Sequence, residues 1–516
     1  MASLVQSIVV VGGGTAGWLT AGLIAAEHQS RIQQQALTIT LCESPSVPTV
    51  GVGEGTWPTM RGTLQKLGLS ETEFVRRCHA SFKQGSRFDR WNEDTASDVY
   101  YHPFAVPEGL SEVNLADFYC TEKPSQSFAA LISAQVSLCE QGLAPKQITH
   151  PEFSGAVNYG YHLDAGAFTQ LLREHCTETL GVRHLWDDVV AAPLGEDGAI
   201  THIQTKAHGD ILGELFVDCT GFRSFLLGEQ LQVPFQPCNN VLMADAAITA
   251  HVAYPSPQAP IAGYTRSTAQ EAGWIWDIGL QNRRGVGHVY ANDYLSTEKA
   301  VDQFKAYIAA SGATVADQNI RDIRFQAGRR ARFWHKNCVA VGLSAGFLEP
   351  LEASAMVMIE LAAEAIAEQL PSVTADIPIA AKRYNDTFDY HWQRTVEFLK
   401  LHYVLSKRQT PFWEDNRHPD SIPTRLADLL ALWAHRAPRN SDFERRSELF
   451  QAISYQYILY GMAFPTATVR TLSHRQAHLA DTVMARNQKM IHGLTETLPA
   501  HRDLLEKIHK YGLASI

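Results

Sequence analysis

Short apolar runs mark the first part of the chain. Residues 8–11 and 36–41 are largely apolar or β-branched, a pattern typical of strands buried on both faces in a parallel sheet. Residues 18–28, which lie between these runs, carry apolar side chains at helical spacing, so this stretch predicts a β-α-β unit. Residues 213–217 and 338–341 repeat the apolar pattern and predict two further strands of the same sheet.

The pattern changes after about residue 380. Glycines become rare there, and apolar residues follow the helical period. The predicted helical stretches are residues 382–400, 424–435, 447–460 and 476–489. We therefore expect an α/β protein with a sheet-containing module in residues 1–380 and a mainly helical module in residues 381–516 packed on it.

A glycine motif lies between the first predicted strand and the first predicted helix. Residues 12–17 read GGGTAG, which is G-x-G-x-x-G in the context that allows a pyrophosphate to approach the backbone and sit at a helix N-terminus. An ordinary tight turn is the alternative, but the strand and helix around the motif favour a dinucleotide site. The residues expected to bind it are Gly12, Gly14, Thr15, Ala16 and Gly17.

Two later positions are expected to reach the same dinucleotide. Glu43 follows the second predicted strand and can accept a bond from a ribose hydroxyl. It lies 31 residues after Gly12 rather than the usual 20 or so, because the polar stretch 27–35 lengthens the connection. Leu343 directly follows Gly342, the glycine that ends the predicted strand at 338–341.

Composition narrows the class of protein. The 516 residues carry a net charge of −10 and no basic block, which argues against a nucleic acid as partner. The eight cysteines show no metal-ligand or paired spacing and are expected to be buried thiols in a reducing compartment, with no metal site. No stretch approaches the roughly 18 apolar residues of a membrane span, and no signal-peptide pattern is present, so we expect a cytoplasmic protein with no membrane contact.

Several motifs occur together and in order. They are GGGTAGW at 12–18, GVGEGT at 51–56, FKQG at 82–85, YHLD at 161–164, WIWDIG at 274–279, EPLE at 349–352, HY at 402–403 and FW at 412–413. Together they resemble the flavin-dependent tryptophan halogenase family. The one clear exception within these motifs is Gly279, which stands where the family's W-x-W-x-I-P motif ends in proline.

The resemblance implies a fold, a cofactor and a reaction. The fold would be a FAD-binding Rossmann-like module of the flavin monooxygenase and halogenase type with a helical substrate module. FADH2, O2 and chloride or bromide would yield hypohalous acid, which then halogenates an aromatic substrate. The stretch that resembles the family's flavin strap supplies Gly51, Val52, Gly53 and Glu54 as further cofactor-binding residues.

A partner enzyme is expected to reduce the flavin. A flavoprotein that takes hydride from a nicotinamide itself commonly carries a second dinucleotide fingerprint. Residues 51–55 lack a third, correctly spaced glycine and open no clear β-α-β unit. The sequence therefore predicts a separate NAD(P)H-dependent flavin reductase, and it is also compatible with a homodimer.

The resemblance assigns the two catalytic side chains. Lys83, otherwise an ordinary surface lysine, would capture hypohalous acid through a hydrogen bond or as a haloamine. Glu352 would stabilise the developing positive charge on the ring and take up its proton. The alternative for Glu352 is a glutamate favoured by a helix N-terminus, and Glu349 is the other carboxylate of the same motif.

The net charge of the chain is negative, so a halide ion must be held by a local group. We expect backbone amides to hold it. Ser354 and Ala355 open an apolar helical stretch, and free N–H groups at a helix N-terminus attract anions. An ordinary capped core helix is the simpler interpretation. The family usually has Glu-Ser-Thr-Gly here, whereas this chain has Glu-Ala-Ser-Ala at 352–355, which leaves chloride and bromide both open.

Aromatic residues are expected to surround the substrate. His102 and Phe104 match a segment that sandwiches the indole ring in relatives, although an isolated pair of this kind would be core. Trp274 and Trp276 would face the same side of a strand, as core or as a wall beside the flavin.

The substrate itself is expected to lack a free amino-acid group. Tyr455, Tyr457 and Tyr460 occupy the region that binds this group in relatives, and Tyr455 and Tyr460 are the expected contacts. Residues 461–480 contain no acidic side chain to pair with an ammonium. We therefore expect an indole-type substrate. A flavin-dependent aromatic hydroxylase, or a flavin-binding relative without halogenase activity, is the alternative.

Overall fold

The computed structural model describes residues 3–47, 53–107, 109–110, 112–445, 448–467 and 472–515. The chain forms two compact units that interleave along the sequence. The first contains residues 1–79, 163–238 and 326–392, and the second contains residues 80–162, 239–325 and 393–516. The modules 1–380 and 381–516 stay a prediction, and their boundary falls inside helix α11 (Ile377–Val404).

The first unit is built on a six-stranded sheet in the order β20-β21-β12-β1-β2-β8. All neighbouring strands in it are parallel except the edge pair β20–β21. Its strands are β1 (Ser7–Val11), β2 (Thr38–Glu43), β8 (Arg183–Trp186), β12 (Leu215–Asp218), β20 (Trp334–His335) and β21 (Cys338–Ala340). The apolar runs of the sequence thus form β1, β2, β12 and β21, which confirms the predicted parallel sheet.

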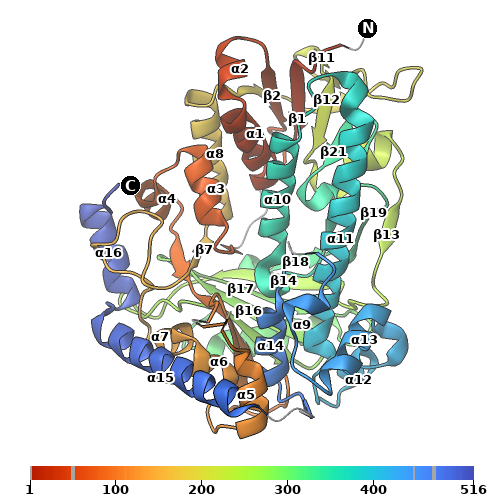
Figure 1. The fold of residues 1–516 in the computed structure, drawn as a ribbon. Coiled ribbons are helices and arrows are strands. Elements are labelled where there is room, and N and C mark those ends of the chain that lie inside the picture. Colours follow the sequence, from red (N-terminus) through yellow and green to blue (C-terminus); the bar gives the residue numbers. More distant parts are fainter. Residues whose placement is uncertain are drawn as a thin grey trace. The chain divides into compact units, whose positions relative to one another are not determined.

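Helices cover this sheet. Helix α1 packs on β1 and β2, and α8 and α10 pack on α1 (Figure 1). The helices of the first unit are α1 (Thr15–Glu27), α2 (Gln29–Gln33), α3 (Met60–Leu67), α4 (Glu71–Arg77), α8 (Ala165–Glu178), α10 (Ser354–Glu368) and the first part of α11. Its remaining strands are β3 (Glu54–Gly55), β9 (Val189–Ala191), β10 (His202–Thr205), β11 (Gly209–Leu212), β13 (Phe235–Pro237), β19 (Gly328–Arg330) and β22 (Gly346–Phe347).

The second unit is built on a seven-stranded sheet in the order β18-β14-β17-β16-β15-β5-β6. Neighbours in it are antiparallel except β15 and β5. Its strands are β5 (Gly85–Asp89), β6 (Val99–Pro103), β14 (Ala246–Val252), β15 (Thr265–Gln270), β16 (Gly273–Gly279), β17 (Arg284–Tyr290) and β18 (Arg321–Arg324). Separately, β4 (Ser81–Lys83) pairs with β7 (Gly160–Leu163).

Most helices of the second unit come from the last quarter of the chain, as predicted. Helix α15 runs along α6 and α7 (Figure 1), and α9 packs on β14 and β17. The helices are α5 (Leu115–Glu122), α6 (Phe128–Ile132), α7 (Ala134–Glu140), α9 (Thr297–Ala310), α12 (Pro411–Asn416), α13 (Thr424–Trp433), α14 (Ala452–Gly461), α15 (His474–Thr497) and α16 (His501–Tyr511). The mixed α/β class with a helical C-terminal region is therefore confirmed.

One predicted helix is shorter than its pattern suggested. The helical stretch expected at 447–460 begins only at Ala452, and residues 448–451 are not helical. Two apolar positions of the pattern, Leu449 and Phe450, lie in this non-helical stretch, and the ring of Phe450 stacks on Phe398 with centroids 3.7 Å apart. Phe450 is therefore buried by stacking on another element rather than by lying on a helix face.

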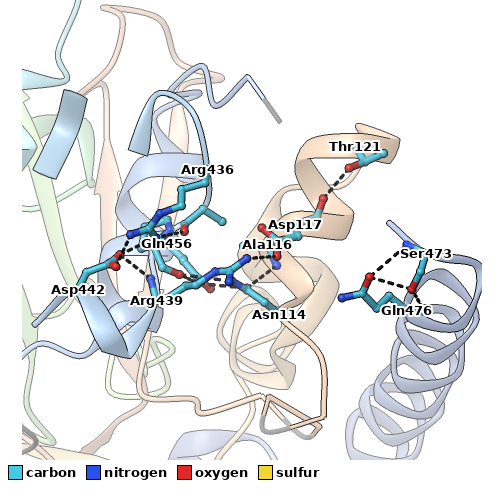
Figure 2. A network of polar contacts seen from close by, with 12 residues as sticks. Asn114, Ala116, Asp117, Thr121, Arg436, Arg439, Asp442, Gln456, Ser473 and Gln476 are labelled. Carbon is cyan, nitrogen blue, oxygen red and sulfur yellow. Dashed lines mark hydrogen bonds and ion pairs between the residues drawn. The ribbon is translucent and has the colours of Figure 1, made fainter. Parts of the chain in front are cut away.

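Polar contacts hold α5 and α14 in the second unit. Gln456 on α14 donates to the side-chain oxygen of Asn114 (3.2 Å), which caps the start of α5 (Figure 2). Asp117 on α5 pairs with Arg439 (3.2 Å), whose backbone N–H donates to Asp442 (2.9 Å). These bonds fix the helix that carries the tyrosines expected near the substrate.

No helix in the described ranges is both long enough and apolar enough to cross a membrane. All eight cysteines are free thiols. Five of them are buried, and burial raises the pKa of Cys42 to about 12.

Candidate active site

The glycine loop after β1 makes a turn that only glycine fits at two points. Gly12 has a φ of +116°, and a Cβ there would lie 2.2 Å from the carbonyl oxygen of Cys219. A Cβ on Gly17 would lie 1.9 Å from the carbonyl oxygen of Gly12. The loop therefore brings bare backbone to the edge of the sheet where parallel strands β1 and β12 end.

The loop leads directly into the N-terminus of α1. The N-cap residue Gly14 has no side chain to cap the helix, and the backbone bonds of the helix begin with Trp18 N–H to Gly14 C=O. The N–H groups of Thr15, Ala16 and Gly17 lie in the first turn, where no intrahelical acceptor exists. A Cβ on Gly14 would meet no atom within 4 Å. Free amides beside open space fit a pyrophosphate.

Glu43 is held at the end of β2. Its Oε2 atom lies 3.3 Å from Nε1 of Trp18, which donates a hydrogen bond, and 3.0 Å from Nε2 of His184. The Glu43 side chain also covers Gly13, where a Cβ would lie 2.1 Å from the carboxyl carbon. A carboxylate fixed beside the glycine loop fits a ribose hydroxyl, so the residues of this loop fit a dinucleotide such as FAD.

The strap is described only in part. Gly51 and Val52 lie outside the described residues, whereas Gly53 has a φ of +136° and Glu54 begins β3. Burial raises the pKa of Glu54 from 4.5 to about 7. This carboxyl group is therefore partly protonated at neutral pH, which suits a position beside a cofactor or backbone acceptor.

Glu352 lies in a strained turn just before α10. Its φ is +63° and that of Ala353 is +54°, two consecutive left-handed residues that each cost roughly 1–2 kcal/mol. The indole N–H of Trp57 donates to the carbonyl oxygen of Glu352 (2.8 Å). Glu352 and Glu349 are both buried, but only Glu352 has the left-handed backbone. Strain of this kind is typical of functional sites.

The residues predicted to bind halide line one cavity. This cavity has a volume of about 70 Å³, and its wall contains Ser354 and Ala355 together with Leu343, which the sequence predicts at the dinucleotide rather than at the halide. Much of the rest is apolar, with the aromatic rings of Phe333, Phe347, Tyr384, Phe388 and Trp392. The N-cap residue Ala353 makes no side-chain cap bond, so the amides of the first turn of α10 have no intrahelical acceptor.

A buried carboxyl group ties α10 to α3. Glu360 accepts hydrogen bonds from the hydroxyls of Thr63 (2.6 Å) and Thr59 (3.3 Å). Burial raises its pKa from 4.5 to about 7. The folded state therefore binds the Glu360 proton more tightly than the unfolded state. The contribution of this protonated carboxyl group to the free energy of unfolding is fully present below pH 4.5 and is lost as the pH rises through 7.

We expect Glu360→Gln to remove this pH dependence. A neutral amide keeps the size of the side chain without the cost of a buried charge, so at pH 8 the variant should exceed the wild type in free energy of unfolding by on the order of 3 kcal/mol. At pH 4.5 the two should be similar. Urea unfolding at both pH values measures the difference.

Glu364→Gln, one turn further along and partly exposed, is the matched control and should follow the wild type. Parallel pH profiles for Glu360→Gln and the wild type would contradict the assignment.

Lys83 is a fully buried lysine at the end of β4. Its Nζ lies 5.2 Å from the centroid of the Phe104 ring. The residue opposite Lys83 on β7 is Gly160, which has no side chain and so leaves room on this face. Burial of an ammonium carries a desolvation cost.

His162 shares this face of the β4–β7 pair. It stands opposite Ser81 and thus diagonal to Lys83, within reach of a long side chain. Its Nε2 lies 2.9 Å from the hydroxyl of Thr265. Burial and the charge of Lys83 lower the pKa of His162 well below its usual value, so the imidazole is neutral.

His102 lies on β6, and Phe104 follows directly after the end of this strand. The His102 ring lies near the rings of Phe398 (5.6 Å) and Tyr457 (6.0 Å). Tyr457 also donates from its hydroxyl to the carbonyl oxygen of Ala105 (3.2 Å). The structure thus brings Lys83, Phe104 and His102 together and adds Tyr457 to the group.

Tyr455 and Tyr460 lie elsewhere on α14. Tyr455 is fully buried among aromatic rings, including Trp433 (5.0 Å) and Phe443 (5.2 Å), and its hydroxyl has no partner among the described residues. Tyr460 packs on Phe128 (5.2 Å). Their role in substrate binding stays a prediction, and both also serve as core.

Trp274 and Trp276 lie on β16, as the pattern predicts, with ring centroids 6.2 Å apart. Trp276 covers Gly287 on the neighbouring strand, where a Cβ would lie 2.1 Å from the indole ring. Trp274 packs on Trp91 (6.2 Å). Core packing is thus present, and a wall beside the flavin stays a prediction.

Comparison with known proteins gives the family. Residues 7–478 match the family of tryptophan halogenases. The chain belongs to the tryptophan halogenase family. It is 34% identical to tryptophan 6-halogenase SttH from Streptomyces toxytricini, over 88% of this chain and 89% of that protein.

Solved structures of halogenases have the same fold. The structure of a tryptophan halogenase from Shewanella frigidimarina superimposes with a TM-score of 0.95 at 43% identity, covering 99% of both chains. BrvH, a flavin-dependent halogenase from Brevundimonas sp., superimposes with a TM-score of 0.85 at 30% identity, covering 98% of this chain and 99% of that one.

Three residues at these sites are not among the site residues that the sequence predicts. Trp57 follows the strap, His162 lies within the YHLD motif, and Tyr457 lies between the two tyrosines expected at the substrate. For Trp57 the signal was its place two residues after Gly55. For Tyr457 nothing in the pattern separates it from its neighbours on α14, because all three tyrosines are buried.

Proposed function

We propose that this member of the tryptophan halogenase family is an FADH2-dependent halogenase of an indole-type aromatic substrate. The observation that carries the proposal is the buried ammonium of Lys83 beside the ring of Phe104. A buried ammonium beside an aromatic side chain is suited to capture a polar oxidant next to the ring of an aromatic substrate. Bound FADH2 would supply the electrons with which O2 and halide yield hypohalous acid.

The chain's own residues would then act in turn. The free amides of Ser354 and Ala355 hold the halide at the wall of the apolar cavity. The ammonium of Lys83 donates a hydrogen bond to hypohalous acid, or its amine forms a haloamine. Phe104 and His102 hold the aromatic ring, and Glu352 takes up the proton that the ring loses. Catalysis thus rests on orientation and on one proton acceptor.

The glycine loop and Glu43 are proposed to bind the FAD, together with Glu54 of the strap. Because the chain has a single dinucleotide fingerprint, we propose that a separate NAD(P)H-dependent flavin reductase supplies FADH2. Turnover with NADH should then require an added reductase, whereas chemically reduced FAD should support turnover without it.

The substrate is proposed to lack a free amino-acid group. No acidic residue occurs in 461–480, and Tyr455 is fully buried among aromatic rings. A tryptophan zwitterion would therefore find no carboxylate in residues 461–480 to pair with its ammonium, and an unpaired buried charge is costly.

We expect kcat/KM for indole to exceed that for tryptophan by about tenfold or more, in line with the cost of one unpaired polar group. The assay supplies each compound separately with FAD, reductase, O2 and bromide or chloride, and mass spectrometry identifies the product. Faster turnover of tryptophan would contradict the proposed substrate class. Hydroxylated product without halide would favour an aromatic hydroxylase, and flavin oxidation with no product from either compound would favour a relative without halogenase activity.

A further inference from the structure

The backbone at Glu352 and Ala353 requires support from outside the turn. Both residues carry a Cβ, yet both are left-handed, with ψ values of 7° and 38°. Within the turn, the N–H of Ala353 donates to the carbonyl oxygen of Pro350 (3.0 Å). Rotation of the peptide plane between Glu352 and Ala353 would relieve the strain at Ala353. It would also turn the carbonyl oxygen of Glu352 to the opposite side.

Trp57 opposes that rotation. Its indole N–H donates to the same carbonyl oxygen of Glu352 at 2.8 Å. The bond is lost if the peptide plane turns, so it stabilises the strained arrangement specifically. A phenylalanine at this position would preserve much of the packing but could not donate.

The segment that carries Trp57 is itself anchored on α10. Thr59 and Thr63 donate to Glu360, and Lys66 pairs with Glu364 one turn further on. The stretch from the strap through α3 is therefore fixed to α10 at successive points. Trp57 is the contact at the Glu352 end of this series.

We propose that Trp57 is a positioning residue that holds the backbone of Glu352 and thereby the direction of its carboxylate. The inference rests on the proposed function of Glu352 as the proton acceptor. It predicts that the indole N–H, rather than the bulk of the side chain, controls transfer of the halogen to the aromatic ring.

The first test uses the protein without cofactor. In Trp57→Phe, hydrogen exchange of the backbone amides in residues 350–358 should be roughly tenfold faster than in the wild type, because the bond that supports the turn from outside is removed. Trp334→Phe is the matched control, since the Trp334 indole also donates to a backbone carbonyl, that of Lys336 (3.1 Å). The control should leave exchange at 350–358 unchanged.

The second test is kinetic. For Trp57→Phe, kcat for aromatic halogenation should fall roughly tenfold, since small displacements of a catalytic group are costly. Hypohalous acid formation without aromatic substrate, measured with a scavenger, and the KM for the aromatic should stay within about twofold. Trp57→His, which keeps a ring N–H, is the second variant and should recover part of the rate.

Unchanged exchange and unchanged kcat in Trp57→Phe would overturn the proposal. An equal fall in hypohalous acid formation would overturn it too, because Trp57 would then act at the flavin. A wild type that forms no hypohalous acid would refute the proposed function, while the exchange experiment would still decide whether Trp57 holds the turn.

Discussion

Lys83→Met is expected to lower aromatic halogenation by roughly 10³-fold, a loss typical for removal of a group that acts directly on the reacting atoms. Methionine keeps an unbranched side chain on β4 but removes the ammonium beside Phe104. FAD binding and hypohalous acid formation should persist, because the residues proposed for these two steps lie in the first unit. The product assay and a scavenger assay on the same preparation measure the two steps.

The stability of the Lys83 variant should separate function from folding. The side chain is fully buried, and methionine fills a similar volume with apolar atoms, so Lys83→Met should remain folded and bind FAD, which urea unfolding and FAD titration check. Lys400→Met is the matched control. That buried ammonium donates to the carbonyl oxygen of Val241 (2.9 Å) and to Asn416 (2.8 Å), so its loss should lower stability and leave halogenation by the folded protein near normal. Normal halogenation by FAD-loaded Lys83→Met would show that the mechanism is wrong.

Glu352→Gln is expected to lower kcat for aromatic halogenation by about 10²–10³-fold, within the range for loss of a general base. Glutamine preserves the size of the side chain and the strained backbone but cannot take up a proton. Hypohalous acid formation should continue, so the scavenger assay should show oxidant released without halogenated product.

The matched comparison is Glu349→Gln, which changes the other buried carboxylate of the same motif. It should retain most of the aromatic halogenation. If Glu349→Gln lost the activity and Glu352→Gln kept it, the two carboxylates would exchange roles. Equal and small effects of both changes would show that neither residue accepts the ring proton.

The features that the sequence predicts best are those that depend on consecutive residues. The strand at 8–11, the glycine loop and the helix after it were predicted together, because a tight turn and a helix N-terminus depend on consecutive residues. The tryptophans of β16 were placed on one strand for the same reason. The helix at 447–460 was predicted too long, because periodicity cannot distinguish a residue on a helix face from one buried by a distant ring, as Phe450 is by Phe398.

The sequence by itself determined the family motifs, the dinucleotide fold and the residue types available for catalysis. The tertiary structure decided which of them meet. It buried Lys83 against Phe104, lined one cavity with Leu343, Ser354 and Ala355, and placed Tyr457 rather than Tyr455 beside the His102 segment. The physical reason is that motifs and turns follow from neighbours along the chain, whereas burial and contact depend on elements that are distant in sequence and meet only when the sheets and helices pack.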